Sequence, residues 1–117
     1  MLQIQARQAG EVTVVKLSGQ LIYGTESQSL AQHVKQQLAA GKIQLLVDLA
    51  EVGFIDSNGV GELVSSFSST KRAGGHFKLC SPQKMVREVL RIVRLPTMIE
   101  MFDTADQALA SFATTAP

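Results

Sequence analysis

A strand, a tight turn and a helix follow one another in the middle of the chain, and this unit constrains the fold most. The strand is predicted by an apolar run that suits a parallel strand covered on both faces, Leu45-Leu46-Val47-Asp48-Leu49. The turn is Phe54-Ile55-Asp56-Ser57-Asn58-Gly59-Val60-Gly61, and the helix is indicated by apolar residues at helical spacing, namely Val60, Leu63, Val64 and Phe67. We therefore expect an α/β fold, with Ser57 as the N-cap of this helix.

The remaining segments continue the same alternation of strands and helices. Further strands are expected at 2–8, 12–17 and 76–80, the first two forming a hairpin, and 98–102 is a short last strand or an extended segment. A first helix is predicted after a cap at Thr25 and ends near Gly41, and the central helix covers about 58–73. Ser81-Pro82 is expected to start a third helix, Thr104 a last one, and the tail from Ala113 to be frayed. The prediction is one domain over residues 1–117, a mixed sheet with an N-terminal hairpin and about four helices packed on it.

Composition excludes several classes of function. The net charge is +1, whereas a nucleic-acid-binding surface needs a strongly basic balance. No apolar run approaches the ~20 residues of a membrane span, and the start of the chain lacks a signal-peptide pattern, so we expect a cytoplasmic protein without direct membrane insertion. Cys80 is the only cysteine, which excludes an internal disulfide. No metal ligands at metal-binding spacing are found, and no cofactor is expected.

Ser57 is the leading candidate for a functional residue. In the simpler interpretation it only caps the helix, since serine oxygens accept bonds from unpaired N–H groups at helix starts. A helix start also favours anions, which makes a serine there a candidate for phosphorylation. Gly59 and Gly61 favour the functional interpretation, because glycine is unfavourable inside a helix by ~1 kcal/mol relative to alanine. Two glycines in the first turn suggest that another surface approaches the backbone closely, either that of a partner or the active site of a kinase.

Two other charged features have alternative interpretations. Asp56 is either a turn residue that accepts bonds from backbone N–H groups or a carboxylate that orients Ser57 for a partner. Asp48 lies within an apolar strand, where a charge must be satisfied, and is expected to bond to a nearby loop. Basic residues at spacings of three, four and three form a stripe that is either a solvated helix face or a contact for an acidic partner or lipid surface: Lys84, Arg87, Arg91 and Arg94.

The motif in the central turn resembles the signature of STAS domains, and more narrowly that of bacterial anti-sigma factor antagonists. Its core here is Asp56-Ser57-Asn58-Gly59-Val60-Gly61, preceded by Val47-Asp48-Leu49. The resemblance continues over almost the whole chain, through Ser18-Gly19, Gly74-Gly75, Ser81-Pro82 with Val86-Arg87, and Phe102-Asp103.

This resemblance implies a phosphorylation switch. In that family the serine after the motif aspartate, here Ser57, is phosphorylated by an anti-sigma factor serine kinase of the histidine-kinase-like ATPase fold. The unphosphorylated protein binds the anti-sigma factor and releases a sigma factor, and a phosphatase resets the switch. The implied partner-binding residues are Asp56, Ser57, Asn58, Gly59 and Gly61, and no catalytic residue is implied.

The chain departs from the family pattern at three positions. Asn58 replaces a second serine, and Gln20 and Ile22 stand where the family commonly has acids near the phosphorylated serine. The loss of these acids bears on the phosphorylation chemistry or on the choice of partner. It keeps open an alternative, an accessory STAS subunit of a membrane assembly such as a lipid-transport ABC system, which is not phosphorylated. An enzyme is disfavoured, because Ser57 lacks a Gly-x-Ser-x-Gly elbow and an assigned base.

Overall fold

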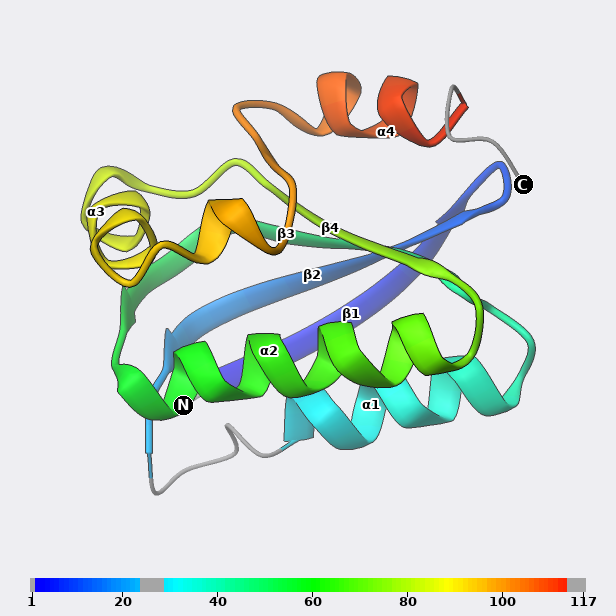
Figure 1. The fold of residues 1–117 in the computed structure, drawn as a ribbon, viewed down its shortest axis with the longest axis horizontal. Coiled ribbons are helices and arrows are strands. Elements are labelled where there is room, and N and C mark those ends of the chain that lie inside the picture. Colours follow the sequence, from blue (N-terminus) through cyan, green and yellow to red (C-terminus); the bar gives the residue numbers. More distant parts are fainter. Residues whose placement is uncertain (1, 24–28, 114–117) are drawn as a thin grey trace.

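A single five-stranded sheet forms the centre of the molecule (Figure 1). The computed structural model describes residues 2–23 and 29–113. The strands lie in the order β1-β2-β3-β4-β5, with β1 antiparallel to β2 and all other neighbours parallel. Their bounds are Leu2–Ala9 for β1, Val12–Leu21 for β2, Gln44–Ile55 for β3, His76–Cys80 for β4 and Met101–Phe102 for β5.

Helices cover both faces of the sheet. Helices α1 and α2 pack side by side on one face, and α4 lies on the other (Figure 1). The helix bounds are Ser29–Ala39 for α1, Ser57–Arg72 for α2, Lys84–Ile92 for α3 and Ala105–Ala113 for α4, with a short 3₁₀ helix η2 at Leu95–Thr97. The larger core lies under α1, α2 and α3, and a smaller one under α4.

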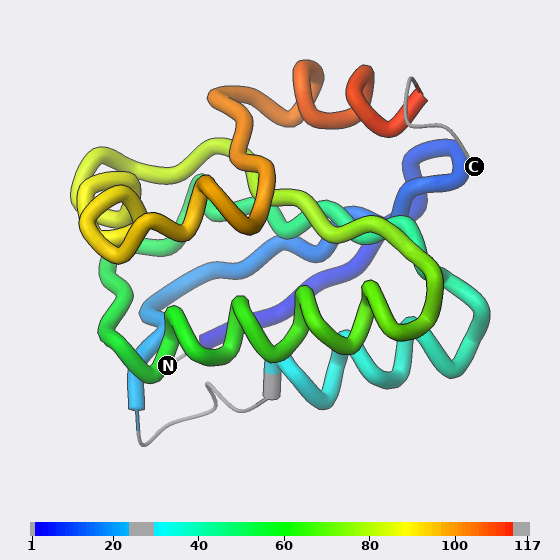
Figure 2. The backbone as a smooth tube through the Cα atoms, viewed as in Figure 1, coloured from blue at the N-terminus to red at the C-terminus, as the bar shows by residue number. Residues whose placement is uncertain are grey.

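The predicted architecture is confirmed: a mixed α/β sheet with an N-terminal hairpin and four helices. The hairpin turn and the start of α2 lie at opposite ends of the molecule (Figure 2). The proposed cap Thr25 and the tail beyond Ala113 lie outside the described residues. Strands β2 and β3 are longer than predicted, because both continue beyond their apolar runs to the end of the sheet where α2 begins.

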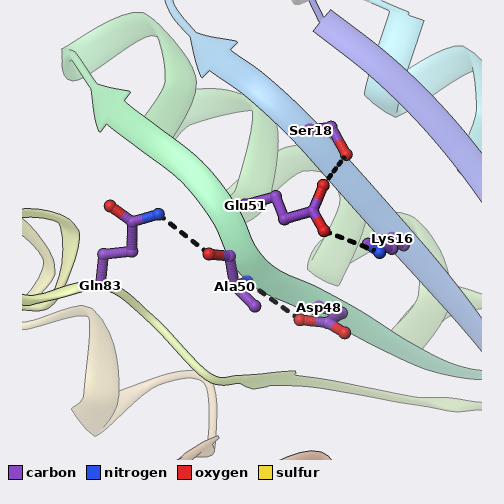
Figure 3. Close-up of polar contacts among 6 residues, drawn as sticks. All are labelled: Lys16, Ser18, Asp48, Ala50, Glu51 and Gln83. Atoms are coloured by element: carbon purple, nitrogen blue, oxygen red, sulfur yellow. Dashed lines mark hydrogen bonds and ion pairs between the residues drawn. The ribbon is translucent and has the colours of Figure 1, made fainter.

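Strand β3 bulges beside β2, and polar side chains satisfy the bulge (Figure 3). Two residues of β3, Leu49 and Ala50, lie opposite one residue of β2. The N–H of Ala50 donates to Asp48 Oδ1 at 2.9 Å, and its carbonyl accepts from Gln83 Nε2 at 2.9 Å. Asp48 therefore bonds within its own strand, and the prediction that it bonds a nearby loop is wrong. The Gln83 bond ties the start of α3 to β3.

The start of α3 differs from the prediction. Ser81 has a left-handed backbone with φ +60°, and Gln83 occupies the N-cap position without a side-chain cap bond. The helix begins at Lys84, two residues later than Pro82, which the Ser81-Pro82 pattern predicted as the first helical residue. The reason is tertiary: the Ser81 N–H donates to the Phe102 carbonyl at 2.9 Å, which extends the pairing of β4 with β5.

Candidate functional site

The candidate site is the junction where β3 ends and α2 begins. Asp56 has an extended backbone, φ −112° and ψ −175°, and its Oδ1 accepts a hydrogen bond from the N–H of Gly59 at 2.9 Å. Asp56 is therefore the N-cap and Ser57 the first helical residue, so the prediction of Ser57 as the cap is wrong. Aspartate and serine are both good N-cap residues. Asp56 takes the cap position because its N–H still donates to the Leu21 carbonyl of β2, at 3.3 Å, so that strand pairing continues up to this residue and the helix starts after it.

The second oxygen of Asp56 holds the segment that follows β2. Oδ2 accepts a hydrogen bond from the backbone N–H of Tyr23 at 3.0 Å. The N–H groups of Tyr23 and then Gly59 stabilise the carboxylate, which lowers the pKa of Asp56. The interpretation of Asp56 as a residue that bonds backbone N–H groups is confirmed. Contact of Asp56 with a partner stays a prediction.

The two glycines of the first turn have different surroundings. Gly59 is buried, and a Cβ at this position would collide with the carbonyl oxygen of Leu21. The close approach inferred for Gly59 is therefore made by the chain's own backbone, which corrects the expectation that it leaves room for a partner. Gly61 is exposed, and a Cβ there would meet nothing within 4 Å. Only Gly61 has the open surface that the partner hypothesis requires.

Ser57 is exposed at the start of a 16-residue helix. Within the described part of the chain, its hydroxyl has no hydrogen-bond partner and therefore no base that would activate it. Asn58 is exposed beside it. The geometry leaves the hydroxyl accessible as an acceptor of a transferred group, near the positive end of the helix dipole.

Two aromatic residues near Ser57 were not recognised from the sequence. Tyr23, whose N–H is held by Asp56, is 76% exposed, and Phe54 on β3 is 40% exposed. Phe54 lies opposite Gln20 in the sheet register, so the segment with the non-acidic positions Gln20 and Ile22 adjoins this junction. Both aromatics flank the motif in the sequence, but a pattern cannot show that they face solvent.

Neither a metal site nor a membrane span is found among the residues that the structure describes. No group of three or more histidine, cysteine, aspartate or glutamate side chains is placed to hold a metal ion there. No helix in the same ranges is long and apolar enough to cross a bilayer.

Comparison with known proteins defines the family. The STAS domain model matches residues 3–108, so the chain belongs to the STAS domain family. A relative from Thermotoga neapolitana, named as a candidate anti-sigma factor antagonist, is 36% identical over 72 residues. The aligned segment covers 62% of this chain and 64% of that relative, so the match spans just under two thirds of the relative's length.

Solved structures show the same fold. An anti-sigma factor antagonist from Mycobacterium paratuberculosis superposes with a TM-score of 0.84 at 22% identity, covering 95% of this chain and 93% of that one. The antagonist SpoIIAA in its unphosphorylated form gives a TM-score of 0.71 at 17% identity, covering 97% of this chain and 100% of that one. Bacillus SpoIIAA is also known in a phosphorylated form, with a TM-score of 0.71, 19% identity, and coverage of 94% of this chain and 99% of that one.

Proposed function

We propose that this protein is an anti-sigma factor antagonist whose partner binding is switched by phosphorylation of Ser57. The observation that carries the proposal is the exposed hydroxyl of Ser57, which has no hydrogen-bond partner among the described residues and lies in the first turn of α2, directly after the capping residue Asp56. The names of the relatives support the general role, and the solved phosphorylated form of SpoIIAA supports a phosphorylated state within this fold. The proposed partner is an anti-sigma factor serine kinase of the histidine-kinase-like ATPase fold, and a phosphatase reverses the modification.

The chemistry of the switch is a phosphoryl transfer. The Ser57 oxygen attacks the γ-phosphorus of ATP, the bond to the β-phosphate oxygen breaks, and ADP leaves. The hydroxyl proton passes to a base that the kinase supplies, because no described residue is hydrogen-bonded to the Ser57 hydroxyl and the Asp56 oxygens already accept backbone N–H groups. In this proposal the protein is the substrate and the binding partner, and the kinase is the enzyme.

Phosphorylation is expected to change binding without unfolding the domain. A phosphate adds about −1.5 to −2 charges at pH 7 and is favoured near a helix N-terminus. Asp56 already accepts the Gly59 N–H, so the helix stays capped whether or not Ser57 is modified. Five exposed residues near Ser57 in the described part of the chain are uncharged: Gln20, Tyr23, Phe54, Asn58 and Gly61. The charge of the adjacent Asp56 is already satisfied by backbone N–H groups. A new dianion on this surface would have to be desolvated by any partner that packs against it.

The proposed partner surface is the first turn of α2 with the two aromatics beside it. Ser57, Asn58 and Gly61 are exposed on this surface. Gly59 is buried, and its missing side chain lets the end of β2 lie close to the first turn of α2. Asp56 acts mainly by holding Tyr23, and tyrosine is enriched among residues that dominate binding energy at interfaces.

The test is to incubate the protein with ATP and the candidate kinase-like anti-sigma factor and to map the phosphate by mass spectrometry. Phosphate on Ser57, lost in Ser57→Ala, is expected. Ser65, an exposed serine further along α2, provides the matched control, and Ser65→Ala should be modified like the wild type. Absence of phosphate on Ser57 would contradict the proposal, and co-purification with a permease complex instead would favour the membrane-assembly alternative.

A further inference from the structure

The exposed apolar side chains of the molecule are concentrated in one short segment. Six large hydrophobic residues are exposed among those that the structure describes, and four of them lie between residues 84 and 98. Ile92 is 76% exposed, and the other three are about half exposed: Met85, Val93 and Met98. Clusters of this kind mark interaction sites, whereas single exposed apolar residues do not.

The same segment carries a concentrated positive charge. Residues 84–98 contain four basic residues and one acid, Glu88, which gives a net charge of +3. Because the whole chain has a net charge of +1, the rest of the chain carries −2. Arg87 pairs with Asp103 at 2.8 Å and Arg91 with Glu88 at 3.4 Å, while no ion pair to Lys84 or Arg94 is found in the described residues.

Helical geometry places the exposed side chains of α3 itself on one surface. Met85, Glu88 and Ile92 are spaced by three and four residues, so they line one stripe of α3, with Lys84 and Arg91 beside it. The opposite stripe, Val86 and Leu90, is fully buried in the larger core. We call the exposed charged and large apolar residues of α3 and of the segment directly after it the α3 surface: Lys84, Met85, Glu88, Arg91, Ile92, Val93, Arg94 and Met98.

The α3 surface and the Ser57 junction belong to the same end of the molecule. Strands β3 and β4 are parallel neighbours, so the helices that follow them begin at the same end of the sheet, where the carboxyl ends of both strands lie. Figure 1 shows α3 and the start of α2 at this same end. The Gln83 Nε2 bond to the Ala50 carbonyl fixes the start of α3 against β3 (Figure 3).

A contact limited to the exposed residues around Ser57 would be smaller than a typical stable protein interface. A stable interface takes about 800 Å² and roughly 20–30 residues from each partner. The exposed residues around Ser57 fall well below that number. An apolar centre with charged residues around it is the usual composition of a protein interface. The α3 surface lacks the tryptophan or tyrosine typical of membrane-surface contacts and includes the acid Glu88, which favours a protein over an anionic lipid surface.

We infer that the α3 surface is a second contact for the partner that recognises Ser57, and that the facing surface of that partner is an apolar recess with an acidic rim. This inference rests on the proposed function. The positive charge accelerates association with an acidic surface, and the apolar side chains slow dissociation.

Charge and contact variants test the inference by calorimetric titration against the ATPase that phosphorylates Ser57. Ile92→Asp should weaken binding at least tenfold. The double variant Lys84→Glu/Arg94→Glu should bind severalfold more weakly than the wild type at low salt. At 0.5 M NaCl the difference in affinity between this variant and the wild type should be smaller. The control is Lys35→Glu/Lys42→Glu, which makes the same charge change at exposed positions on α1 and its following turn and should stay within twofold of the wild type. A thermal melt of each variant checks the fold.

The outcomes separate this inference from the proposed function. If Ser57 is phosphorylated but Ile92→Asp and the double variant bind like the wild type, the second contact is wrong and the switch stands. If Ser57 is not phosphorylated, the proposed function fails. A parallel experiment uses vesicles of 70% phosphatidylcholine and 30% phosphatidylglycerol. Vesicle binding that Ile92→Asp abolishes, with unchanged ATPase affinity, would assign the α3 surface to a membrane and overturn the inference.

Discussion

The carboxylate of Asp56 accepts the backbone N–H of Tyr23 at 3.0 Å, a contact between residues 33 positions apart in the chain. The other oxygen of the same carboxylate caps α2 through the N–H of Gly59 at 2.9 Å. One side chain thus fixes both the start of the helix and the segment that follows β2. The motif aspartate is therefore a positioning residue for the surface around Ser57.

Asp56→Asn tests this positioning role through the pH dependence of stability. The folded-state pKa of Asp56 is lowered by the two N–H groups, so its stabilisation is present above the unfolded pKa of about 3.9 and is lost as pH falls through the folded value. At pH 7 the variant should melt several degrees below the wild type, and the difference should shrink at acidic pH. Asp106→Asn, in the first turn of α4, is the control. A difference in melting temperature between Asp56→Asn and the wild type that stays constant from pH 7 to pH 2 would contradict this role.

Alanine substitutions at the two glycines of the motif should have opposite effects on stability. Gly59→Ala introduces a Cβ that collides with the Leu21 carbonyl, so we expect a loss of several kcal/mol, of the order seen for overpacked sites (about 1–3) or more. Gly61→Ala meets open space and should stabilise the helix by up to ~1 kcal/mol. Urea denaturation of the two variants provides the measurement.

The same pair of variants reports on partner binding. Gly61→Ala should remain fully folded yet bind the partner more weakly, because the added methyl group occupies the open surface beside Ser57. Unchanged partner affinity in Gly61→Ala would show that no partner packs closely at this position.

The sequence predicted the fold well because its signals are local. Apolar runs and helical periodicity predicted the order of strands and helices, and the motif located the junction of β3 and α2. The last strand is shorter than the predicted 98–102 and covers only Met101–Phe102. The misassigned cap at Ser57 and the role of Gly59 share one cause: both depend on Leu21 of a neighbouring strand, which a local pattern cannot reveal. The exposure of Tyr23 and Ile92 is likewise a property of packing and not of the pattern.

Lys78 on β4 should anchor α4 to the sheet. Its side chain is 5% exposed, and its Nζ donates to Ser111 Oγ at 2.9 Å, pairs with Glu100 at 3.3 Å and lies 4.6 Å from the centre of the Phe112 ring. Lys78→Ala should lower the free energy of unfolding by about 3 kcal/mol, because it leaves a cavity and removes these contacts. Lys78→Met keeps most of the volume and should cost about 1 kcal/mol. Equal losses in both variants would contradict a packing role for the side-chain stem.

Cys80 should resist alkylation in the folded protein. Burial raises the pKa of its thiol to about 11, so very little thiolate is present near neutral pH, and the side chain has no exposed surface. Mass spectrometry after iodoacetamide treatment at pH 8 should show unmodified native protein and a single adduct in 6 M guanidinium chloride. Rapid labelling of the native protein would mean that the edge formed by β4 and β5 opens readily.

The most direct measurement of the central claim is the affinity of the kinase-like anti-sigma factor for this protein with and without phosphate on Ser57. The two forms are purified, phosphorylation is verified by mass spectrometry, matching circular dichroism spectra establish that the fold is unchanged, and both are titrated calorimetrically. We expect the phosphorylated form to bind at least tenfold more weakly, a difference of about 1.4 kcal/mol in binding free energy. Equal affinities of the two forms, with Ser57 fully phosphorylated in one of them, would contradict this expectation.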